Sequence, residues 1–216
     1  LSVLPLVLQV NEEIKADRAR LIEVRRARTD GKTISAANRL WLAALADRYK
    51  TGRDNLSELT RRADIIPPSL ALAQAAEESG WGTSRFAIEG NALFGQWTFE
   101  RDRGIVPAKR ATDRYHKIRS FDTLMDAVRA YALNLNTHRA YQQFRADRLG
   151  LRSMGKSLDG WALSSSLTKY SERGKNYVES LKSLIQSNQL EKLDQAKLRE
   201  KIVRHSKFSR SGDPAI

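Results

Sequence analysis

The spacing of apolar residues predicts a chain built almost entirely of helices. Near its start, apolar side chains recur every three or four positions, at Val7, Val10, Ile14, Leu21 and Val24, and this is the period of one helix face. The triplet Asp30-Gly31-Lys32 then ends the pattern. The same reasoning predicts further helices over residues 35–49, 54–65, 67–79, 122–135, 158–167 and 176–189. We expect Asp122 to cap the helix that begins there.

The helical pattern stops between residues 98 and 120. Short apolar runs around Ile105 and Ile118 are interrupted by Gly104 and Pro107, and such interruptions predict short, irregular strands. The fold class expected from the pattern is therefore mainly α with a small β region. The chain shows no internal repeat, and a basic tail follows the last helix.

The helix predicted over 67–79 differs from the others because it is apolar on all sides. Pro67-Pro68-Ser69 supplies a fixed φ and a hydroxyl cap at its start, and residues 70–76 all have side chains that are small or unbranched at Cβ. A helix without a polar face is typically buried. We therefore expect this helix to lie in the core.

Two acids, Glu77 and Glu78, occupy the last turn of this helix, before the glycine-flanked Trp81. Burial raises the pKa of a carboxyl group, and so does the negative end of the helix dipole. A carboxyl group with a raised pKa can act as a general acid near neutral pH. The residues do not choose between Glu77 and Glu78, and two solvated acids at a helix end are the alternative interpretation.

Aromatic and polar side chains gather directly after these acids: Trp81, Phe86, Asn91, Phe94 and Trp97. Aromatic rings beside an acid are typical of a glycan-binding cleft, because they stack on the apolar faces of sugars. The same residues could instead belong to the core.

These motifs resemble a known enzyme family. The segment 66–86, IPPSLALAQAAEESGWGTSRF, and the segment 91–97, NALFGQW, are similar to the bacterial Bax-like branch of the glucosaminidase family, glycoside hydrolase family 73. The similarity continues through residues 121–141 and 170–188 and includes residues 4–14, so it covers most of residues 1–190.

The resemblance implies a lysozyme-like α+β fold with a helical lobe and a small β-hairpin lobe. The implied organisation is an N-terminal helical extension (residues 1–62), a glucosaminidase domain (63–190) and a basic C-terminal tail (191–216). The implied activity is hydrolysis of the β-1,4 bond between N-acetylglucosamine and N-acetylmuramic acid in peptidoglycan, without a cofactor.

The family's general acid directly precedes Ser-Gly-Trp-Gly, and by this motif it is Glu78. The family places a second carboxylate in the β-lobe, for which we take Asp113, with Glu100 and Asp102 as alternatives. The substrate's own acetamido group could also replace it. Tyr170 is implied as a cleft-facing residue with Tyr177. The remaining substrate-binding candidates are Trp81, Asn91, Phe94 and Trp97.

Composition adds an expectation about binding partners. The formal net charge is +13 and the pI is about 10.2, so a polyanionic partner is expected. Arginines along the first helix could follow a nucleic-acid backbone, but no nucleic-acid-binding motif accompanies them. Peptidoglycan carries peptide carboxylates, and we expect attraction to the cell wall rather than to nucleic acid. We expect a monomer.

No metal site is predicted. The three histidines, His116, His138 and His205, are scattered, and the chain has no cysteine. The apolar start is shorter than a membrane span. By resemblance, we expect an export or anchor segment upstream and a periplasmic or envelope location.

Two further activities fit the acid-bearing motif. A lytic transglycosylase has a similar fold and a glutamate before serine at a helix end, although this chain lacks the Gly-Leu-Met-Gln run of those enzymes. A noncatalytic peptidoglycan-binding module is the other possibility, because residues 98–120 match other branches of the family poorly.

Overall fold

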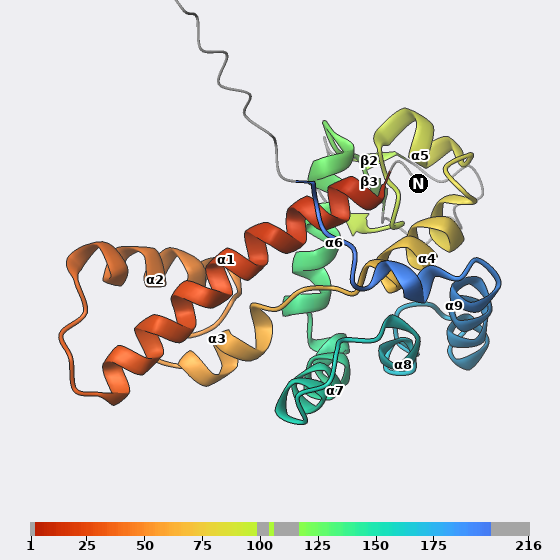
Figure 1. The fold of residues 1–216 in the computed structure, drawn as a ribbon. Helices are drawn as coiled ribbons and strands as arrows, with labels where there is room; N and C mark the ends of the chain where they lie inside the picture. Colours follow the sequence, from red (N-terminus) through yellow and green to blue (C-terminus); the bar gives the residue numbers. More distant parts are fainter. Residues whose placement is uncertain (1–2, 99–103, 106–116, 200–216) are drawn as a thin grey trace, which may run out of the picture.

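A computed structural model describes residues 3–98, 104–105 and 117–199 of the chain (Figure 1). The α-helices in this part are α1 (Leu4–Thr29), α2 (Ala36–Arg48), α3 (Leu56–Arg62), α4 (Pro68–Ser79), α5 (Arg85–Gly90), α6 (Leu124–Thr137), α7 (Gln142–Ser153), α8 (Gly160–Ser164) and α9 (Lys175–Ser187). Two short 3₁₀-helices follow α6 and α9, η1 (Arg139–Tyr141) and η2 (Leu190–Leu193).

The strands form one small antiparallel sheet beside α5. Its strands β1 (Trp97–Thr98), β2 (Gly104–Ile105) and β3 (Lys117–Arg119) lie in the order β1-β3-β2. Ile118 is in register with Trp97 on one side and with Ile105 on the other. The expected fold class, mainly α with a small β region, is confirmed.

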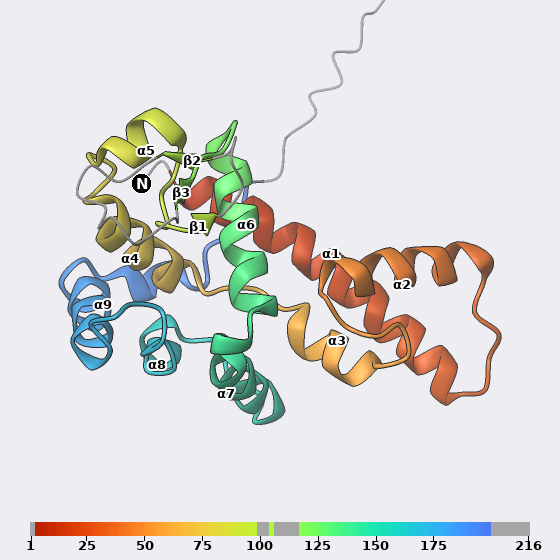
Figure 2. The ribbon, with the colours of Figure 1, turned by 180° about the vertical axis from the view of Figure 1, so that it is seen from behind.

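Two hydrophobic cores lie along α1, and both views of the ribbon show α2 and α3 at the end of this helix away from the sheet (Figures 1 and 2). The early part of α1 contributes Val7, Val10 and Ile14 to the main core, together with α4, α6 and α9. Its later part packs Leu21 and Val24 against α2 and α3. Helix α1 therefore connects the two cores. The domain boundary expected between residues 62 and 63 remains a prediction.

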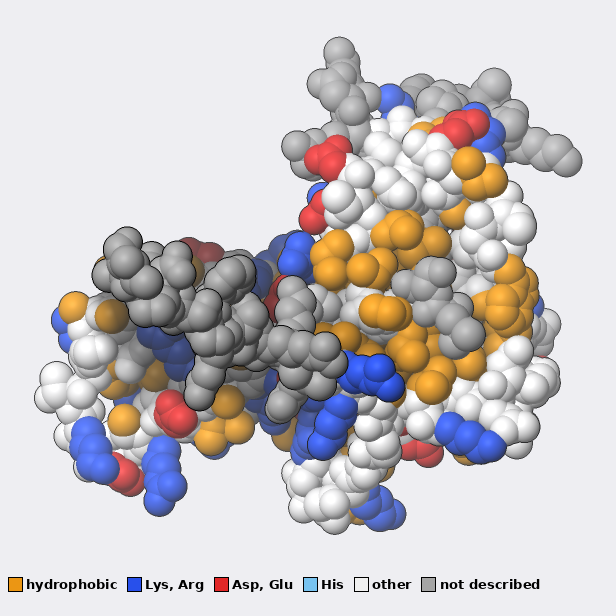
Figure 3. Space-filling model, turned by 45° about the horizontal axis from the view of Figure 1, so that its top comes forward, with side chains coloured by type: hydrophobic (Ala, Val, Ile, Leu, Met, Phe, Trp, Pro, Cys, Tyr) orange, Lys and Arg blue, Asp and Glu red, His pale blue; other side chains and the backbone are white. Residues whose placement is uncertain are grey.

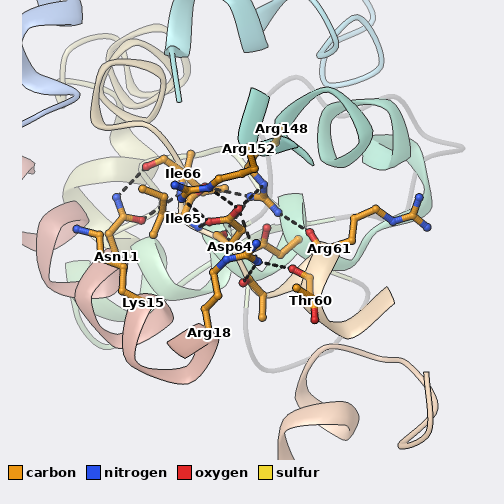
Figure 4. Close-up of polar contacts among 12 residues, drawn as sticks. Asn11, Lys15, Arg18, Thr60, Arg61, Asp64, Ile65, Ile66, Arg148 and Arg152 are labelled. Carbon is orange, nitrogen blue, oxygen red and sulfur yellow. Dashed lines mark hydrogen bonds and ion pairs between the residues drawn. The ribbon is translucent and has the colours of Figure 1, made fainter. Parts of the chain in front are cut away.

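A buried charge cluster joins the two cores (Figure 4). Asp64, which follows α3, is 2% exposed and accepts hydrogen bonds from Arg152 at 2.9 and 3.2 Å. Arg148 is fully buried beside Asp64, and Arg18 of α1 lies 3.7 Å from the Asp64 carboxylate. Beside this cluster, the Asn11 amide exchanges two hydrogen bonds with the Ile66 backbone, at 2.8 and 3.1 Å.

Helix α7 has no counterpart among the predicted helices because its buried face carries arginines. Arg145 is 1% exposed and Arg148 is fully buried, so an apolar pattern does not mark this face. Backbone carbonyls replace water around both side chains. Arg145 donates to Leu135 and His138, and Arg148 donates to carbonyls between residues 61 and 65.

Two predicted helix caps are wrong. Helix α6 is capped by Thr123 rather than Asp122, since the Thr123 hydroxyl accepts from the Asp126 amide. Ser69 does not cap α4 with its hydroxyl. Its hydroxyl and its amide both donate to Asp194, at 2.8 Å each, because the chain after α9 brings this carboxylate back to the start of α4. The expected burial of α4 is confirmed.

Candidate active site

The end of α4 is a sharp turn that separates Glu78 from Trp81. Gly80 ends the helix in the left-handed conformation with φ of 57°, which glycine adopts without a Cβ clash. Trp81 follows with φ of 61° and is 66% exposed. The Ser79 hydroxyl fixes the turn by accepting from the Gly82 amide at 2.7 Å. The turn therefore presents an aromatic surface beside the end of α4.

Glu78 lies partly buried against α9 and the segment after α5. Its carboxyl group interacts with the hydroxyl of Tyr177, and this interaction lowers the pKa of Glu78. A Cβ placed on Gly95 would lie 3.2 Å from Glu78 Oε2, so only a glycine leaves this approach free. Burial raises the pKa of Glu78, and the charge of Glu77 adds to the effect. Tyr177 and Arg173 act in the opposite direction without cancelling it.

Glu77 occupies a different environment, although it is the adjacent residue. Its carboxylate forms an ion pair with Arg173, whose guanidinium also donates to the Ser180 hydroxyl at 2.7 Å. Of the two acids, Glu78 has the environment that general acid chemistry requires.

Tyr170 lies beside the Tyr177 ring. The two rings stack in parallel with centroids 5.6 Å apart, and Tyr141 lies 5.7 Å from Tyr170 on another side. The Tyr170 hydroxyl donates its proton to the Phe94 carbonyl at 3.1 Å. Its oxygen can still accept one hydrogen bond from a water molecule or a sugar hydroxyl. The structure thus brings Tyr170, Tyr177 and Glu78 together.

Phe94 and Asn91 have structural contacts in the same segment. Phe94 is 2% exposed and stacks on Tyr131 with centroids 3.9 Å apart. The Asn91 amide donates to the Phe121 carbonyl at 2.9 Å and to the Asp122 carbonyl at 3.3 Å. These contacts hold the segment that carries Gly95 against Glu78. Substrate binding by either side chain remains a prediction.

The carboxylates of the β-lobe lie outside the described residues. This applies to Asp113 and to its alternatives, Glu100 and Asp102. Trp97 is described only as the residue of β1 that pairs with Ile118. The identity of a second catalytic carboxylate therefore stays a prediction.

Comparison with known proteins gives a family for this site. Residues 53–190 match the glucosaminidase family model, described as mannosyl-glycoprotein endo-beta-N-acetylglucosaminidase. The chain belongs to the glucosaminidase family. It is also 35% identical over 197 residues to Protein bax of Escherichia coli (strain K12), covering 87% of this chain and 68% of that protein. No solved structure matches the chain.

Family membership confirms the Bax-like glucosaminidase resemblance and supports a glycosidase activity related to peptidoglycan. The matched region contains α4, the sheet and α9, so it includes every described residue placed around Glu78. The bond that is cut and the role of each residue belong to the proposal below.

The candidate site also contains residues that sequence reasoning missed. Gln74 and Gly95 are absent from the predicted set, yet Gln74 is bonded to Tyr177 and Gly95 lies against the acid. The sequence does contain a signal for Gln74, because this polar residue lies one helical turn before Glu78 on an otherwise apolar helix. A polar residue in that position needs a buried partner.

A cavity of about 850 Å³ lies away from Glu78, between α1 and α6. Its charged residues include Glu13 and Arg129, which pair at 2.7 Å, and Asp17 and Arg48, which also pair at 2.7 Å. The bond to Arg129 lowers the pKa of Glu13. Because the bond from Arg129 disfavours the protonated form of Glu13, we place the acid chemistry at Glu78 rather than in this cavity.

Metal and membrane sites have no support in the part of the chain that the structure describes. No group of three His, Asp or Glu side chains there has an arrangement suited to a metal ion. No helix there is both long and apolar enough to cross a bilayer.

Proposed function

We propose that this glucosaminidase is a peptidoglycan hydrolase that cleaves the β-1,4 bond between N-acetylglucosamine and N-acetylmuramic acid, with Glu78 as general acid. The observation that carries the proposal is the environment of Glu78, whose pKa is raised by burial beside an exposed tryptophan. Glucosaminidase-family membership of residues 53–190 supports the substrate class.

In the proposed reaction, Glu78 gives its proton to the glycosidic oxygen as the bond to C1 breaks. Water adds to C1 and loses a proton to a β-lobe carboxylate, for which Asp113 is the candidate, or the acetamido group of the substrate stabilises C1 first. Tyr170 can accept a hydrogen bond from the attacking water, since its own proton is engaged by the Phe94 carbonyl. Trp81 offers a stacking surface for a sugar ring.

The basic charge suits this substrate and its surroundings. On the face drawn in Figure 3, Lys and Arg side chains are spread over the surface with acidic side chains between them, and hydrophobic side chains gather on one part. With a net charge of +13, attraction to wall carboxylates would be weakened by salt. We propose a location in the periplasm or envelope and a monomeric enzyme.

The test is product analysis. Purified peptidoglycan is digested, the new reducing ends are reduced with borohydride, and the sugars are identified by mass spectrometry. Reduced N-acetylglucosamine ends are expected. Anhydro ends would indicate a lytic transglycosylase instead, and binding without any new end would indicate a wall-binding module.

Gly95→Ala is expected to slow hydrolysis by about tenfold, because displacing the Glu78 carboxylate by a fraction of an ångström disturbs the reacting geometry. The matched control is Gly155→Ala. Gly155 has a similar φ of 65° but no atom within 4 Å of its Cβ position. Both variants should lose about 1–2 kcal/mol of stability from the left-handed backbone. Equal activity in the two variants would contradict this role for Gly95.

The rate should fall as the pH rises through the pKa of Glu78, since only the protonated acid donates. Glu77→Gln removes a charge that raises this pKa, so the alkaline limb of kcat/KM should move to lower pH. The measurement is kcat/KM on a soluble glycan fragment across pH. A limb that does not move, or that moves to higher pH, would argue against Glu78 as the titrating group.

A further inference from the structure

Gln74 connects the acid to the core through two tyrosines. It is fully buried on α4, between Tyr131 of α6 and Tyr177 of α9, which are each 1% exposed. The Tyr131 hydroxyl donates to Gln74 Oε1 at 2.7 Å, and Gln74 Nε2 donates to the Tyr177 oxygen at 2.9 Å. The Tyr177 hydroxyl in turn interacts with the Glu78 carboxyl group and lowers its pKa.

This chain of bonds has one direction. A tyrosine hydroxyl carries a single proton, and the Tyr177 oxygen already accepts from the amide of Gln74. The Tyr177 proton therefore points to Glu78, which accepts it through a carboxyl oxygen. If the Gln74 amide were flipped by 180°, its oxygen would face Tyr177 and accept the Tyr177 proton. Glu78 would then lose its hydrogen-bond donor. The proton of Tyr131 sets the orientation, because it needs the amide oxygen as acceptor.

We propose that Gln74 is a positioning residue that holds the Tyr177 hydroxyl as a donor to the Glu78 carboxylate and so stabilises the charge left on Glu78 after proton transfer. The inference rests on the proposed function in naming Glu78 as the acid. It assigns Gln74 no contact with the substrate. Its effect passes entirely through Tyr177.

Other groups also shift the pKa of Glu78, and a test must separate their effects from the effect of Gln74. Glu77 lies on the same helix as Glu78, and Arg173 lies before α9. The charge of Glu77 raises the pKa of Glu78, and the charge of Arg173 lowers it. The phenols of Tyr141 and Tyr170 lie nearby as neutral groups, since burial raises both of their pKa values. Neither the charges nor these phenols change when Gln74 is replaced, so a shift caused by Gln74 can be isolated.

The experiment follows the titration of the Glu78 carboxyl carbon by ¹³C NMR, with Glu78→Gln identifying the signal. Tyr177→Phe removes the donor and keeps the ring, and it should raise the pKa of Glu78. Gln74→Met should raise it in the same direction. In the double variant, the pKa should equal that of Tyr177→Phe alone, because Gln74 acts through Tyr177.

Three outcomes would overturn the inference: an unchanged Glu78 pKa in folded Gln74→Met, a pKa that falls, or additive shifts in the double variant. If Gln74→Met does not fold, Tyr131→Phe provides the second route, since it removes only the hydroxyl that orients the amide. It should shift the Glu78 pKa upward by less than Tyr177→Phe does. Gln143→Met, on the exposed surface of α7, is the control and should leave the pKa unchanged.

This readout is independent of hydrolysis. If the wild type forms no new reducing ends, the proposed function fails while the titration still tests the role of Gln74. If the wild type is active and the titration contradicts Gln74, only the positioning role fails. If both the proposed function and the role of Gln74 hold, the alkaline limb of kcat/KM in Gln74→Met should move to higher pH together with the Glu78 titration.

Discussion

Glu78→Gln is expected to lower the rate of peptidoglycan hydrolysis by a factor of about 10²–10⁴, because an amide cannot donate the proton that the leaving oxygen requires. The substitution is nearly isosteric and keeps a group that can bond to Tyr177. The folded structure should therefore persist, and circular dichroism and the thermal unfolding midpoint should resemble those of the wild type. The rate is measured as release of reducing ends from purified peptidoglycan.

The matched control for this prediction is Glu77→Gln. It makes the same chemical change one residue away, at a carboxylate paired with Arg173. On the acidic plateau of its pH profile, this variant should keep activity within a few-fold of the wild type. A loss in Glu77→Gln as large as in Glu78→Gln would show that the motif assigns the acid to the wrong glutamate, or that the two act as a unit.

Asp64→Asn should be the most destabilising of the substitutions considered, by about 3–5 kcal/mol. The charge it removes is the one that compensates Arg148, which is fully buried, and Arg18, which is largely buried. Burial lowers the pKa of Arg148 to about 10, so its guanidinium is still charged near neutral pH. Without Asp64, that charge stays in the core with only carbonyl partners. Urea unfolding at pH 7 gives the free energy of unfolding.

Asp54→Asn is the control for Asp64. Asp54 forms an ion pair with Arg28 at 3.3 Å, but its side chain is 93% exposed. An exposed pair is screened by water, so its loss should change stability by about 0.5 kcal/mol or less. Similar effects in the two variants would contradict the importance of burial at Asp64.

The Asp64 cluster also predicts how stability depends on pH. Burial raises the pKa of Asp64, but the bond from Arg152 and the charges of Arg148 and Arg18 outweigh it and hold the pKa below its usual value. The carboxylate therefore stabilises the fold at pH values above the unfolded pKa of about 4. This stabilisation is lost as the pH falls through the lower folded value. Asp64→Asn should lack that part of the acid dependence.

The regular elements were predictable because their determinants are local. Apolar periodicity predicts α1, α2, α6 and α9 within a few residues, and the interruptions after residue 98 predict a small sheet. The left-handed turn at Gly80 follows from a glycine placed after an apolar helix. Helix α7 escapes this reasoning because Arg145 and Arg148 fill its buried face, and their acceptors are carbonyls from other segments.

By itself, the sequence determined where most of the helices lie and that two acids end a buried helix, since both follow from residue type and spacing along one segment. Only the tertiary structure decided how the two acids differ, because Arg173 reaches Glu77 and Tyr177 reaches Glu78 from α9 and the loop before it. The cap that Asp194 places on α4 has the same origin, because the two partners lie 125 positions apart in the sequence. The pKa of a carboxyl group depends on charges and donors within a few ångströms, and packing sets those distances.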